Sequence, residues 1–410
     1  MLKAISLFTG IGGLDFGFEA AGFSTAVAVE MDAVACRELR RNRDWPLLAD
    51  DIHKFSSQQI LDTGGLVPGE ADVLIGGPPC QPFSKSGYWA GGDAARLSDP
   101  RSSTLEAYLR VLRDCRPKTF LLENVHGLAF KGKDEGLKFL LEGIQSINKG
   151  LGTNYIPYCK KLNAAEYGVP QSRERVFLIG SRDGKPFRFP ERTHCTTDDV
   201  EGIDSGLMAY KTAWDALGDL PADAGGDELR VKGKWGELLP SIPEGNNYLW
   251  HTGRGGGMPL FGWRTRYWSF LLKLKKDQPS WTIQAQPGPA IGPFHWRNRM
   301  LSGRELCRLQ TFPDNITFGC SRSEVQKLVG NAVPSLLAEV LALEIKRQLL
   351  GVPADAALKL LPPSRGVAPP PEPVYPVPEK YHHLLGDHAD HPGEGRGRGA
   401  AVRQIEQDLF

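Results

Sequence analysis

The chain has 410 residues, of which 41% are hydrophobic and 24% are charged, and its formal net charge is +1 at pH 7. This size allows one large domain and a smaller one, and the balanced charge excludes a globally basic protein, so any nucleic-acid surface must be local. The seven cysteines are scattered without metal-ligand spacing, as in reduced cytoplasmic proteins, and we expect no metal site. No apolar run approaches the roughly 20 residues of a membrane span, and the amino terminus does not resemble a signal peptide, so we expect no membrane contact.

The amino-terminal segment predicts a strand, a glycine turn and a helix. An apolar run at 4–8 leads into the glycine-rich run 9–13, and apolar residues recur at helical spacing over 14–21. Glycines between a strand and a helix let a ligand approach the backbone closely. The pattern is not the dinucleotide fingerprint, so the turn alone is weak support for a cofactor site.

The next predicted strand, 26–30, ends in a carboxylate. Glu30 lies about 20 residues beyond the glycines, the distance at which nucleotide-binding folds place an acceptor for a ribose hydroxyl. A solvated glutamate at a strand end is an equally good interpretation. A third short strand is predicted near 46–48, directly before Asp50 and Asp51.

Residues 72–84 carry the most informative pattern, Asp-Val-Leu-Ile-Gly-Gly-Pro-Pro-Cys-Gln-Pro-Phe-Ser. An apolar run of strand length breaks at two glycines, and prolines stand on both sides of Cys80. A thiol on a stiff loop at the carboxyl end of a strand lies where open α/β sheets place their chemistry. A buried structural cysteine is the alternative, and the prolines and the polar Gln81 argue against it.

Two later segments add charged residues to the predicted sheet. Residues 119–123 predict a core strand that ends in Glu123, a residue that is costly to bury without a purpose. The run 167–180 predicts a turn and a strand with Arg173 and Arg175 on one face. Without a catalytic role, the glutamate would be a structural salt-bridge partner and the arginines would form a surface ion pair.

Taken in order over about 350 residues, these motifs resemble those of the cytosine-C5 DNA methyltransferases. The resemblance implies an α/β fold, with a Rossmann-like S-adenosylmethionine-dependent methyltransferase sheet and a smaller, loop-rich target-recognition domain. The implied catalytic domain comprises 1–185 and a returning helix at 326–350, and the recognition domain lies between them at 186–325. Beyond the resemblance, 351–410 is rich in proline, and we expect a flexible, unpacked tail.

The resemblance also implies roles for individual residues. Cys80 is the expected nucleophile, Glu123 contacts the cytosine ring, and Arg173 and Arg175 orient the flipped base and the carboxylate. We favour Asp51 over its neighbour for contact with the adenine, although the choice depends on strand register. The expected S-adenosylmethionine pocket is lined by Phe8, Gly10, Gly12, Leu14, Glu30, Met31, Asp51, Ile52, Pro79, Leu105, Asn331, Ala332 and Val333.

The variable stretch 186–282 interleaves glycines, aromatic residues and cations, as in a loop-rich domain with a basic face for a duplex. Thr282 stands in Ser-Trp-Thr-Ile-Gln, where the family has Thr-Leu, and we expect it to contact only phosphate. The residues expected to contact DNA are Gln81, Ser84, Arg254, Arg264, Arg266 and Thr282.

The sequence therefore predicts an enzyme that methylates carbon 5 of a flipped-out cytosine in a specific duplex sequence, through an adduct with Cys80. Its compact size fits the modification enzyme of a bacterial restriction–modification system, a monomer paired with an endonuclease of the same specificity. Two alternatives remain. A tRNA cytosine-C5 methyltransferase shares the motifs, but the basic and aromatic segment 232–296 favours duplex reading. A catalytically dead DNA-binding protein is disfavoured because the cysteine, the glutamate and both arginines are present.

Overall fold

One sheet organises the amino-terminal lobe. The computed structural model describes residues 1–79, 103–124, 135–221, 226–262, 266–354 and 357–386. Seven strands lie in the order β3-β2-β1-β4-β5-β7-β6, with β1 to β5 parallel and β7 antiparallel to both β5 and β6. They are β1 (Leu2–Leu7), β2 (Phe23–Val29), β3 (Leu47–Leu48), β4 (Val73–Gly76), β5 (Thr119–Asn124), β6 (Tyr158–Asn163) and β7 (Glu174–Ser181). The predicted α/β class with a largely parallel sheet is confirmed.

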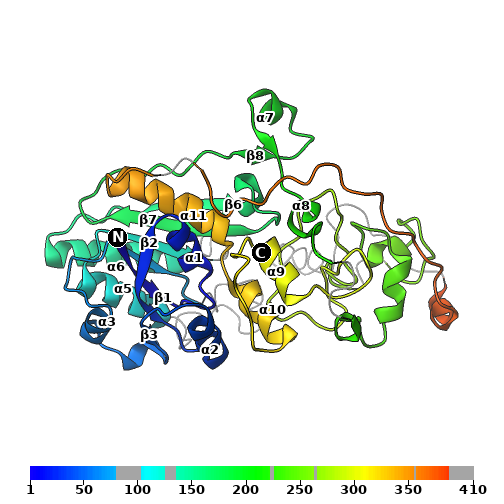
Figure 1. Ribbon diagram of the computed structural model, residues 1–410, viewed down its shortest axis with the longest axis horizontal. Helices are drawn as coiled ribbons and strands as arrows, with labels where there is room; N and C mark the ends of the chain where they lie inside the picture. The colour runs from blue at the N-terminus through cyan, green and yellow to red at the C-terminus, as the bar shows by residue number, and fades with distance from the viewer. Residues whose placement is uncertain (80–102, 125–134, 222–225, 263–265, 355–356, 387–410) are drawn as a thin grey trace, which may run out of the picture.

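Helices cover both faces of this sheet (Figure 1). The sheet has a hydrophobic cluster on each face, because successive side chains of a strand point to opposite faces. In β5, Phe120 belongs to the first of these clusters and Leu121 to the second. The first cluster packs under α3 (Ser57–Thr63), α5 (Ser103–Cys115) and α6 (Glu135–Leu151), and the second under α1 (Gly13–Ala20) and α11 (Ser335–Glu344). Further elements of this lobe are α2 (Ala33–Asn42), η1 (Ile52–Lys54), η5 (Ala164–Tyr167) and η9 (Ile345–Leu349).

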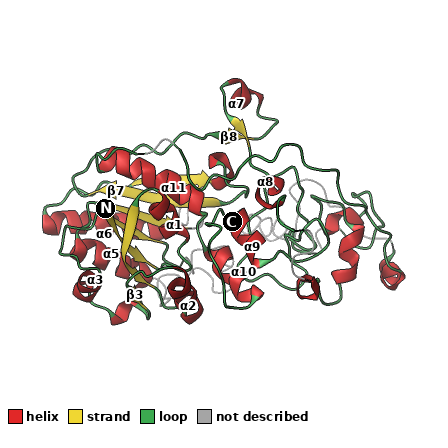
Figure 2. Cartoon of the chain, viewed as in Figure 1, coloured by secondary structure: helices red, strands yellow, loops and turns green. Residues whose placement is uncertain are grey.

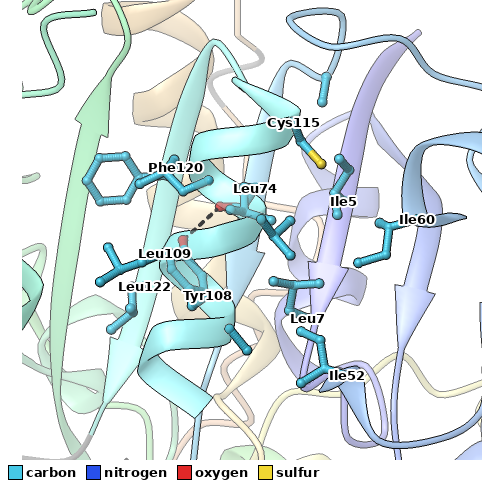
Figure 3. Packing of buried hydrophobic residues seen from close by; sticks show 14 of the residues in the cluster. Ile5, Leu7, Ile52, Ile60, Leu74, Tyr108, Leu109, Cys115, Phe120 and Leu122 are labelled. Atoms are coloured by element: carbon cyan, nitrogen blue, oxygen red, sulfur yellow. Dashed lines mark hydrogen bonds between the residues drawn. The ribbon is translucent and has the colours of Figure 1, made fainter. Parts of the chain in front are cut away.

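Tyr108 of α5 fixes the end of the central strand (Figure 3). Its buried hydroxyl donates to the carbonyl oxygens of Leu121, at 3.0 Å, and Leu74, at 3.3 Å. A Cβ added to Gly76 would lie 3.0 Å from the Tyr108 ring and 3.1 Å from the Leu7 carbonyl oxygen. The last residue of β4 therefore has little room for a side chain, and the chain leaves the sheet toward Pro78 close beside Tyr108.

A buried polar network ties β1 to the glycine turn. The Asp15 carboxylate accepts hydrogen bonds from the hydroxyls of Ser6 and Thr25, each at 3.0 Å, and the Ser6 and Thr9 hydroxyls lie 3.0 Å apart. Burial raises the pKa of Asp15 to about 6, while the two hydroxyl hydrogen bonds oppose the rise. The network holds Thr9 at the turn, and its hydrogen bonds only partly offset the cost that burial places on the ionised form of Asp15.

We expect Asp15→Asn to alter how stability depends on pH. Because the folded-state pKa lies above the ordinary value of 3.8, the stability from this group is present at low pH and is lost as pH rises through about 6. Relative to the variant, the wild-type free energy of unfolding should fall by roughly 1 kcal/mol between about pH 5 and about pH 8. Urea unfolding of both proteins measures this difference, and parallel pH profiles would contradict it.

The second lobe is rich in loops (Figure 2). A third apolar cluster joins it to the first lobe, since Phe16 of α1 packs there with Leu217 and Trp296, and a fourth cluster forms its own core around Tyr248 and Phe270. Its elements are α8 (Ala213–Leu217), η6 (Gly226–Leu229), η7 (Gly236–Ser241), η8 (Tyr248–His251), α9 (Gly303–Leu309) and α10 (Arg322–Asn331). Before them in the chain, β8 (His194–Cys195), α7 (Val200–Asp204) and β9 (Met208–Ala209) form a small unit in which β8 packs on η5 of the first lobe.

Two predicted features need correction. The boundary at 325/326 falls inside α10, whose residues Val325 and Leu328 pack together in the cluster between the lobes. The tail is not unpacked over 357–386, because this segment crosses to the second lobe and ends in η10 (Glu379–Leu384), where Tyr381 is buried. Proline-rich composition alone does not distinguish a solvated linker from a stiff segment that packs on the surface.

The stretch Arg322–Leu349 is long and apolar enough to span a membrane by length and composition, because it contains an 18-residue apolar window with a mean hydropathy of 1.6. Of that window, 72% is buried inside the protein. The stretch comprises α10, α11 and η9, and its apolar residues belong to the second and third clusters. It is therefore part of the core of the fold.

Candidate active site

The carboxyl ends of β1 and β4 lie side by side where the strand order changes direction. Ligands of open α/β sheets bind in the crevice outside this point. The turn after β1 holds three residues at positive φ: Phe8 at 54°, Gly10 at 57° and Gly12 at 86°. For Phe8 this conformation costs about 1–3 kcal/mol, and such strain gathers at functional sites.

Glu30 directly follows β2 and faces this turn. Its Oε2 accepts a hydrogen bond from the Gly10 amide at 2.6 Å, and its Oε1 accepts one from the Asp32 amide at 2.7 Å. Burial raises the pKa of Glu30, and these two amides oppose the rise. The carboxylate is thus held in one orientation, and each oxygen keeps a second lone pair for a hydroxyl donor.

The returning segment 331–333 lies against the same turn. A Cβ added to Gly13 would lie 2.4 Å from the Val333 carbonyl oxygen, so this close contact requires glycine. Val333 is buried in the second cluster, Asn331 is exposed and Ala332 is half-buried. The structure therefore brings Ala332 and Val333 against the start of α1, and a contact of 331–333 with the cofactor stays a prediction.

The other residues expected at the cofactor pocket differ in their surroundings. Asp51 caps η1, accepting a hydrogen bond from the His53 amide at 3.0 Å, and its Oδ1 lies 2.6 Å from His53 Nδ1. Asp50 pairs with Lys54 at 2.9 Å. Both aspartates have partners within the protein, so the choice of Asp51 stays a prediction. Of the remainder, Leu14, Ile52 and Leu105 are buried, Phe8 is half-buried, and Met31 and Pro79 are exposed.

Glu123 stands near the end of β5, beside the end of β4. Its Oε1 lies 2.9 Å from Arg175 Nε, in an ion pair whose side chains are both largely buried. A Cβ added to Gly77 would lie 2.9 Å from Glu123 Oε2, so the carboxylate lies close against the backbone where the cysteine loop begins. Burial raises the pKa of Glu123, and the charges of Arg175 and Arg173 oppose the rise. A carboxyl group in this state holds a proton to higher pH than an exposed glutamate does, and it can therefore act as a proton donor.

The predicted nucleophile Cys80 lies outside the described residues, as do Gln81, Ser84 and Arg264. The described part of the cysteine loop ends at Pro79. Asn124 Nδ2 donates to the Pro78 carbonyl oxygen at 3.4 Å, which holds the beginning of the loop against the end of β5. The chain therefore enters the cysteine loop next to Glu123.

Arg173 joins the two lobes, a role that the sequence did not reveal. Its buried guanidinium donates from Nη2 to the Gly330 carbonyl oxygen at 2.7 Å and from Nη1 to the Ile283 carbonyl oxygen at 3.3 Å. Burial lowers the pKa of Arg173, as does the charge of Arg175, while Glu123 raises it. Its partners stand 157 and 110 residues away in the chain, so no local motif indicates them. Contact with a flipped base stays a prediction.

The described residues expected to contact DNA lie on the second lobe. Arg254 and Thr282 are exposed, and the Thr282 hydroxyl donates to the Ser172 carbonyl oxygen at 2.7 Å. The Arg266 guanidinium lies 5.5 Å from the centroid of the Trp235 ring, a cation–π contact. The hydroxyl of Thr282 therefore helps to join the lobes, and its contact with phosphate stays a prediction.

Sequence reasoning did not select two exposed aromatic residues beside Arg266. Tyr267 is 81% exposed and Trp268 is 58% exposed, and large aromatic side chains on a surface near cations are suited to contact bases. Both residues belong to the aromatic and cationic stretch that the sequence analysis identified. The sequence does not show which aromatic rings of that stretch are exposed and which are buried in the core of the lobe.

We expect Glu30→Ala to weaken S-adenosylmethionine binding by roughly 10–100-fold, because a charge-assisted hydrogen bond of about 1.5–3 kcal/mol is lost. Calorimetry on the folded variant measures the dissociation constant. Glu70→Ala is a matched control, since Glu70 is an exposed glutamate that pairs with Lys3 at the opposite end of the sheet. Unchanged cofactor affinity in Glu30→Ala would remove Glu30 from the site.

The sheet order, the antiparallel β7 and the carboxylates at the strand ends define a class of protein, the Rossmann-like methyltransferases that use S-adenosylmethionine. A solved structure of a proposed DNA modification methyltransferase encoded within an E. coli prophage has this fold, with a TM-score of 0.62. The two proteins are 22% identical, and the match covers 86% of this chain and 100% of that one. At this identity the likeness concerns the fold alone.

The sequence comparisons give the family. Residues 2–347 match the family model for C-5 cytosine-specific DNA methylases. The Type II methyltransferase M.SacI of Streptomyces achromogenes is 41% identical over 372 residues, covering 85% of this chain and 93% of that protein. The Type II methyltransferase M.AquIA of Picosynechococcus is 45% identical over 226 residues, covering 53% of this chain and 89% of that protein. The chain belongs to the C-5 cytosine-specific DNA methylase family, which confirms the resemblance seen in its motifs.

Proposed function

We propose that this methyltransferase transfers a methyl group from S-adenosylmethionine to carbon 5 of a cytosine that is flipped out of a specific duplex sequence. The buried Glu123–Arg175 pair carries the proposal, because it lies where β4 leads into the loop of Cys80. Inside a duplex neither the thiol nor the carboxyl group reaches the ring, so the base must leave the stack at a cost of a few kcal/mol.

The edge of the sheet suits S-adenosylmethionine. Among the described residues, no atom lies within 4 Å of a Cβ built on Gly10, so this part of the chain leaves room for a ligand beside the turn. Glu30 offers a fixed acceptor for a ribose hydroxyl, and Phe8 and Ile52 offer apolar surface for a ring. When bound, S-adenosylmethionine supplies a methyl group on a positively charged sulfur.

The residues of the chain make carbon 5 reactive. The Cys80 thiolate adds to carbon 6 of the cytosine, and the electron pair displaced from the ring double bond makes carbon 5 nucleophilic. Glu123 protonates ring nitrogen 3, which offsets the negative charge that addition brings into the ring. Arg175 holds the Glu123 carboxyl group in the orientation for this contact. After carbon 5 has taken the methyl group, a base removes the carbon-5 proton, the thiolate leaves carbon 6, and nitrogen 3 returns its proton to the Glu123 carboxylate, which restores the aromatic ring.

The second lobe is proposed to read the target sequence, with Arg254, Arg266 and Thr282 on its exposed surface. M.SacI and M.AquIA are type II methyltransferases, and the high coverage of M.SacI supports the same role here. The proposal therefore includes a cytoplasmic, monomeric modification enzyme that works beside a restriction endonuclease of the same specificity.

Transfer of labelled methyl groups to duplex DNA and to tRNA tests this function, together with mapping of methylated cytosines in DNA from an expressing host. We expect methylation of duplex DNA at one cytosine of one short sequence. Methylation of tRNA alone would identify an RNA enzyme instead. Tight duplex binding without any transfer would identify a DNA-binding protein without activity.

A further inference from the structure

A strap formed by residues 357–386 connects the two lobes. It follows α11 and η9, runs across the surface of the protein, and ends on the far side of the second lobe at η10 (Figure 1). The family match ends at residue 347, so the strap lies outside it. Eight of the 17 residues 362–378 are proline, which makes this span a stiff spacer rather than a flexible tether.

The strap is anchored first on the catalytic lobe. The backbone amides of Lys359 and Leu360 donate to the two carboxylate oxygens of Glu339, at 2.7 and 2.9 Å. Glu339 is a buried residue of α11, so the strap supplies the partners that a buried carboxylate needs. Leu358 and Leu361 pack against the second cluster beside it. This end of the strap is therefore fixed to the sheet layer.

The second anchor lies on α8, at the cluster between the lobes. The Arg365 amide donates to Asp215 Oδ1 at 2.8 Å, and Arg365 Nε donates to the Asp215 carbonyl oxygen at 2.9 Å. Arg365 Nη2 also pairs with Asp219 at 2.8 Å. One arginine thus contacts three groups around a five-residue helix, which fixes the direction in which the strap leaves the catalytic lobe.

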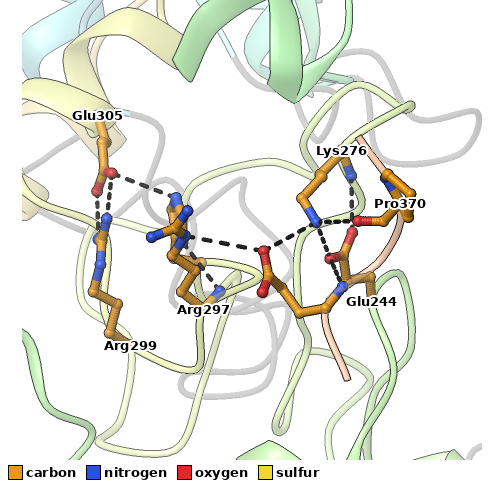
Figure 4. A network of polar contacts seen from close by, with 8 residues as sticks. Glu244, Lys276, Arg297, Arg299, Glu305 and Pro370 are labelled. Carbon is orange, nitrogen blue, oxygen red and sulfur yellow. Dashed lines mark hydrogen bonds and ion pairs between the residues drawn. The ribbon is translucent and has the colours of Figure 1, made fainter. Parts of the chain in front are cut away.

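The third anchor is a buried ion pair of the second lobe that the strap completes (Figure 4). Lys276 Nζ lies 2.7 Å from Glu244 Oε1, and each side chain is only 4% exposed. The strap adds the Pro370 carbonyl oxygen at 2.9 Å and the Glu372 carboxylate at 3.2 Å to Lys276, and the Glu372 amide donates to Glu244 at 2.8 Å. Without the strap, a buried lysine and a buried glutamate would lose hydrogen bonds that offset their desolvation.

The last anchor is aromatic. The Tyr381 ring stacks on Trp235 with centroids 5.9 Å apart and planes at 10°, and its hydroxyl donates to the Lys234 carbonyl oxygen at 2.7 Å. Tyr381 is buried in the fourth cluster, with Val377 and Leu384 packed beside it. The strap therefore ends in the core of the second lobe rather than on its surface.

We propose that the strap is a positioning element for methyl transfer, which holds the recognition lobe at a fixed orientation over the active site. This inference rests on the proposed function, in which one lobe reads DNA while the other acts on the flipped base. A base that is misplaced by about 1 Å can react 100-fold more slowly, so a stiff brace between the lobes has a direct effect on rate. The four anchors on both lobes and their junction supply that brace.

Cutting the strap in the otherwise intact protein tests the proposal. A protease recognition sequence is inserted after Gly366, where the chain is open and Val367 is 97% exposed, and the purified protein is cut. We expect the cut to lower kcat/KM for the duplex by about tenfold or more and to widen the distance distribution between labels on α6 and η6. S-adenosylmethionine affinity should not change, because the expected cofactor residues lie in the catalytic lobe or in the returning segment 331–333, of which Ala332 and Val333 pack against the start of α1. The control carries the same insertion after Gly386, beyond the last anchor.

Two intact variants, Arg365→Gln and Tyr381→Ala, keep the test decisive if cut protein unfolds. Each should lower kcat/KM for the duplex while cofactor affinity and the far-ultraviolet spectrum stay as in the wild type. Unchanged kcat/KM in the folded cut protein, or in both variants, would overturn the proposal. Failure of the proposed function is distinguished by the uncut wild-type protein, which would then not methylate duplex DNA at all.

Discussion

Replacing Glu123 with glutamine lowers kcat by about 10²–10⁴-fold, the range typical of a lost general acid. The amide accepts a hydrogen bond from Arg175 but cannot pass a proton to ring nitrogen 3. In the wild type, burial raises the pKa of Glu123, so the protonated form persists to higher pH than for an exposed glutamate. The wild-type rate should therefore fall as pH rises through this pKa, and the variant should lack that alkaline limb.

Steady-state kinetics across pH measure both effects. Glu174→Gln is a suitable control, because Glu174 is an exposed neighbour on β7 that pairs with Lys161 at 2.9 Å. The control should keep the wild-type rate and pH profile, and duplex affinity should change little in either variant. If Glu123→Gln retained the wild-type kcat, Glu123 would not be the proton donor.

Replacing Cys80 with serine should abolish methyl transfer, since a hydroxyl is far less ionised than a thiol at neutral pH and does not add to the ring. Duplex binding and cofactor binding should remain, because neither depends on the thiolate. Transfer of labelled methyl groups under single-turnover conditions, alongside a duplex-binding assay, separates the two steps. Cys159→Ser provides the control, because Cys159 is an exposed cysteine on β6. A serine variant that still turned over would assign the nucleophile to another residue.

Local patterns in the sequence predicted the parts of the fold and site that depend on neighbouring residues. The glycine turn after β1, Glu30 after β2 and Glu123 on β5 follow from strand length, glycine placement and a carboxylate at a strand end. Parallel pairing then brings these strand ends to one edge of the sheet. Glu30 and Glu123 therefore lie at this edge for a reason that the sequence already contains, and their contacts with a cofactor and a base stay predictions.

Contacts between distant segments could not be predicted in this way. From the sequence, Arg173 is predicted to be a surface arginine or one that contacts the base. Its hydrogen bonds to Gly330 and Ile283 appear only in the folded chain. The sequence likewise predicts a linker where the structure has the strap. The stacking of Tyr381 on Trp235, 146 positions away in the sequence, depends on the folded chain. Its proline content indicates stiffness, but the surface that it packs on depends on the tertiary structure of both lobes.

The central claim is that Cys80 adds to carbon 6 of the target cytosine, and a duplex with 5-fluorocytosine at the target tests it most directly. Fluorine does not leave as a cation, so after methylation the adduct cannot eliminate, and protein, methyl group and DNA should stay covalently joined. Denaturing electrophoresis with labelled S-adenosylmethionine should show a band of the combined mass, absent with Cys80→Ser and slower to form with Glu123→Gln. A stable labelled adduct that still forms with Cys80→Ser would contradict the account.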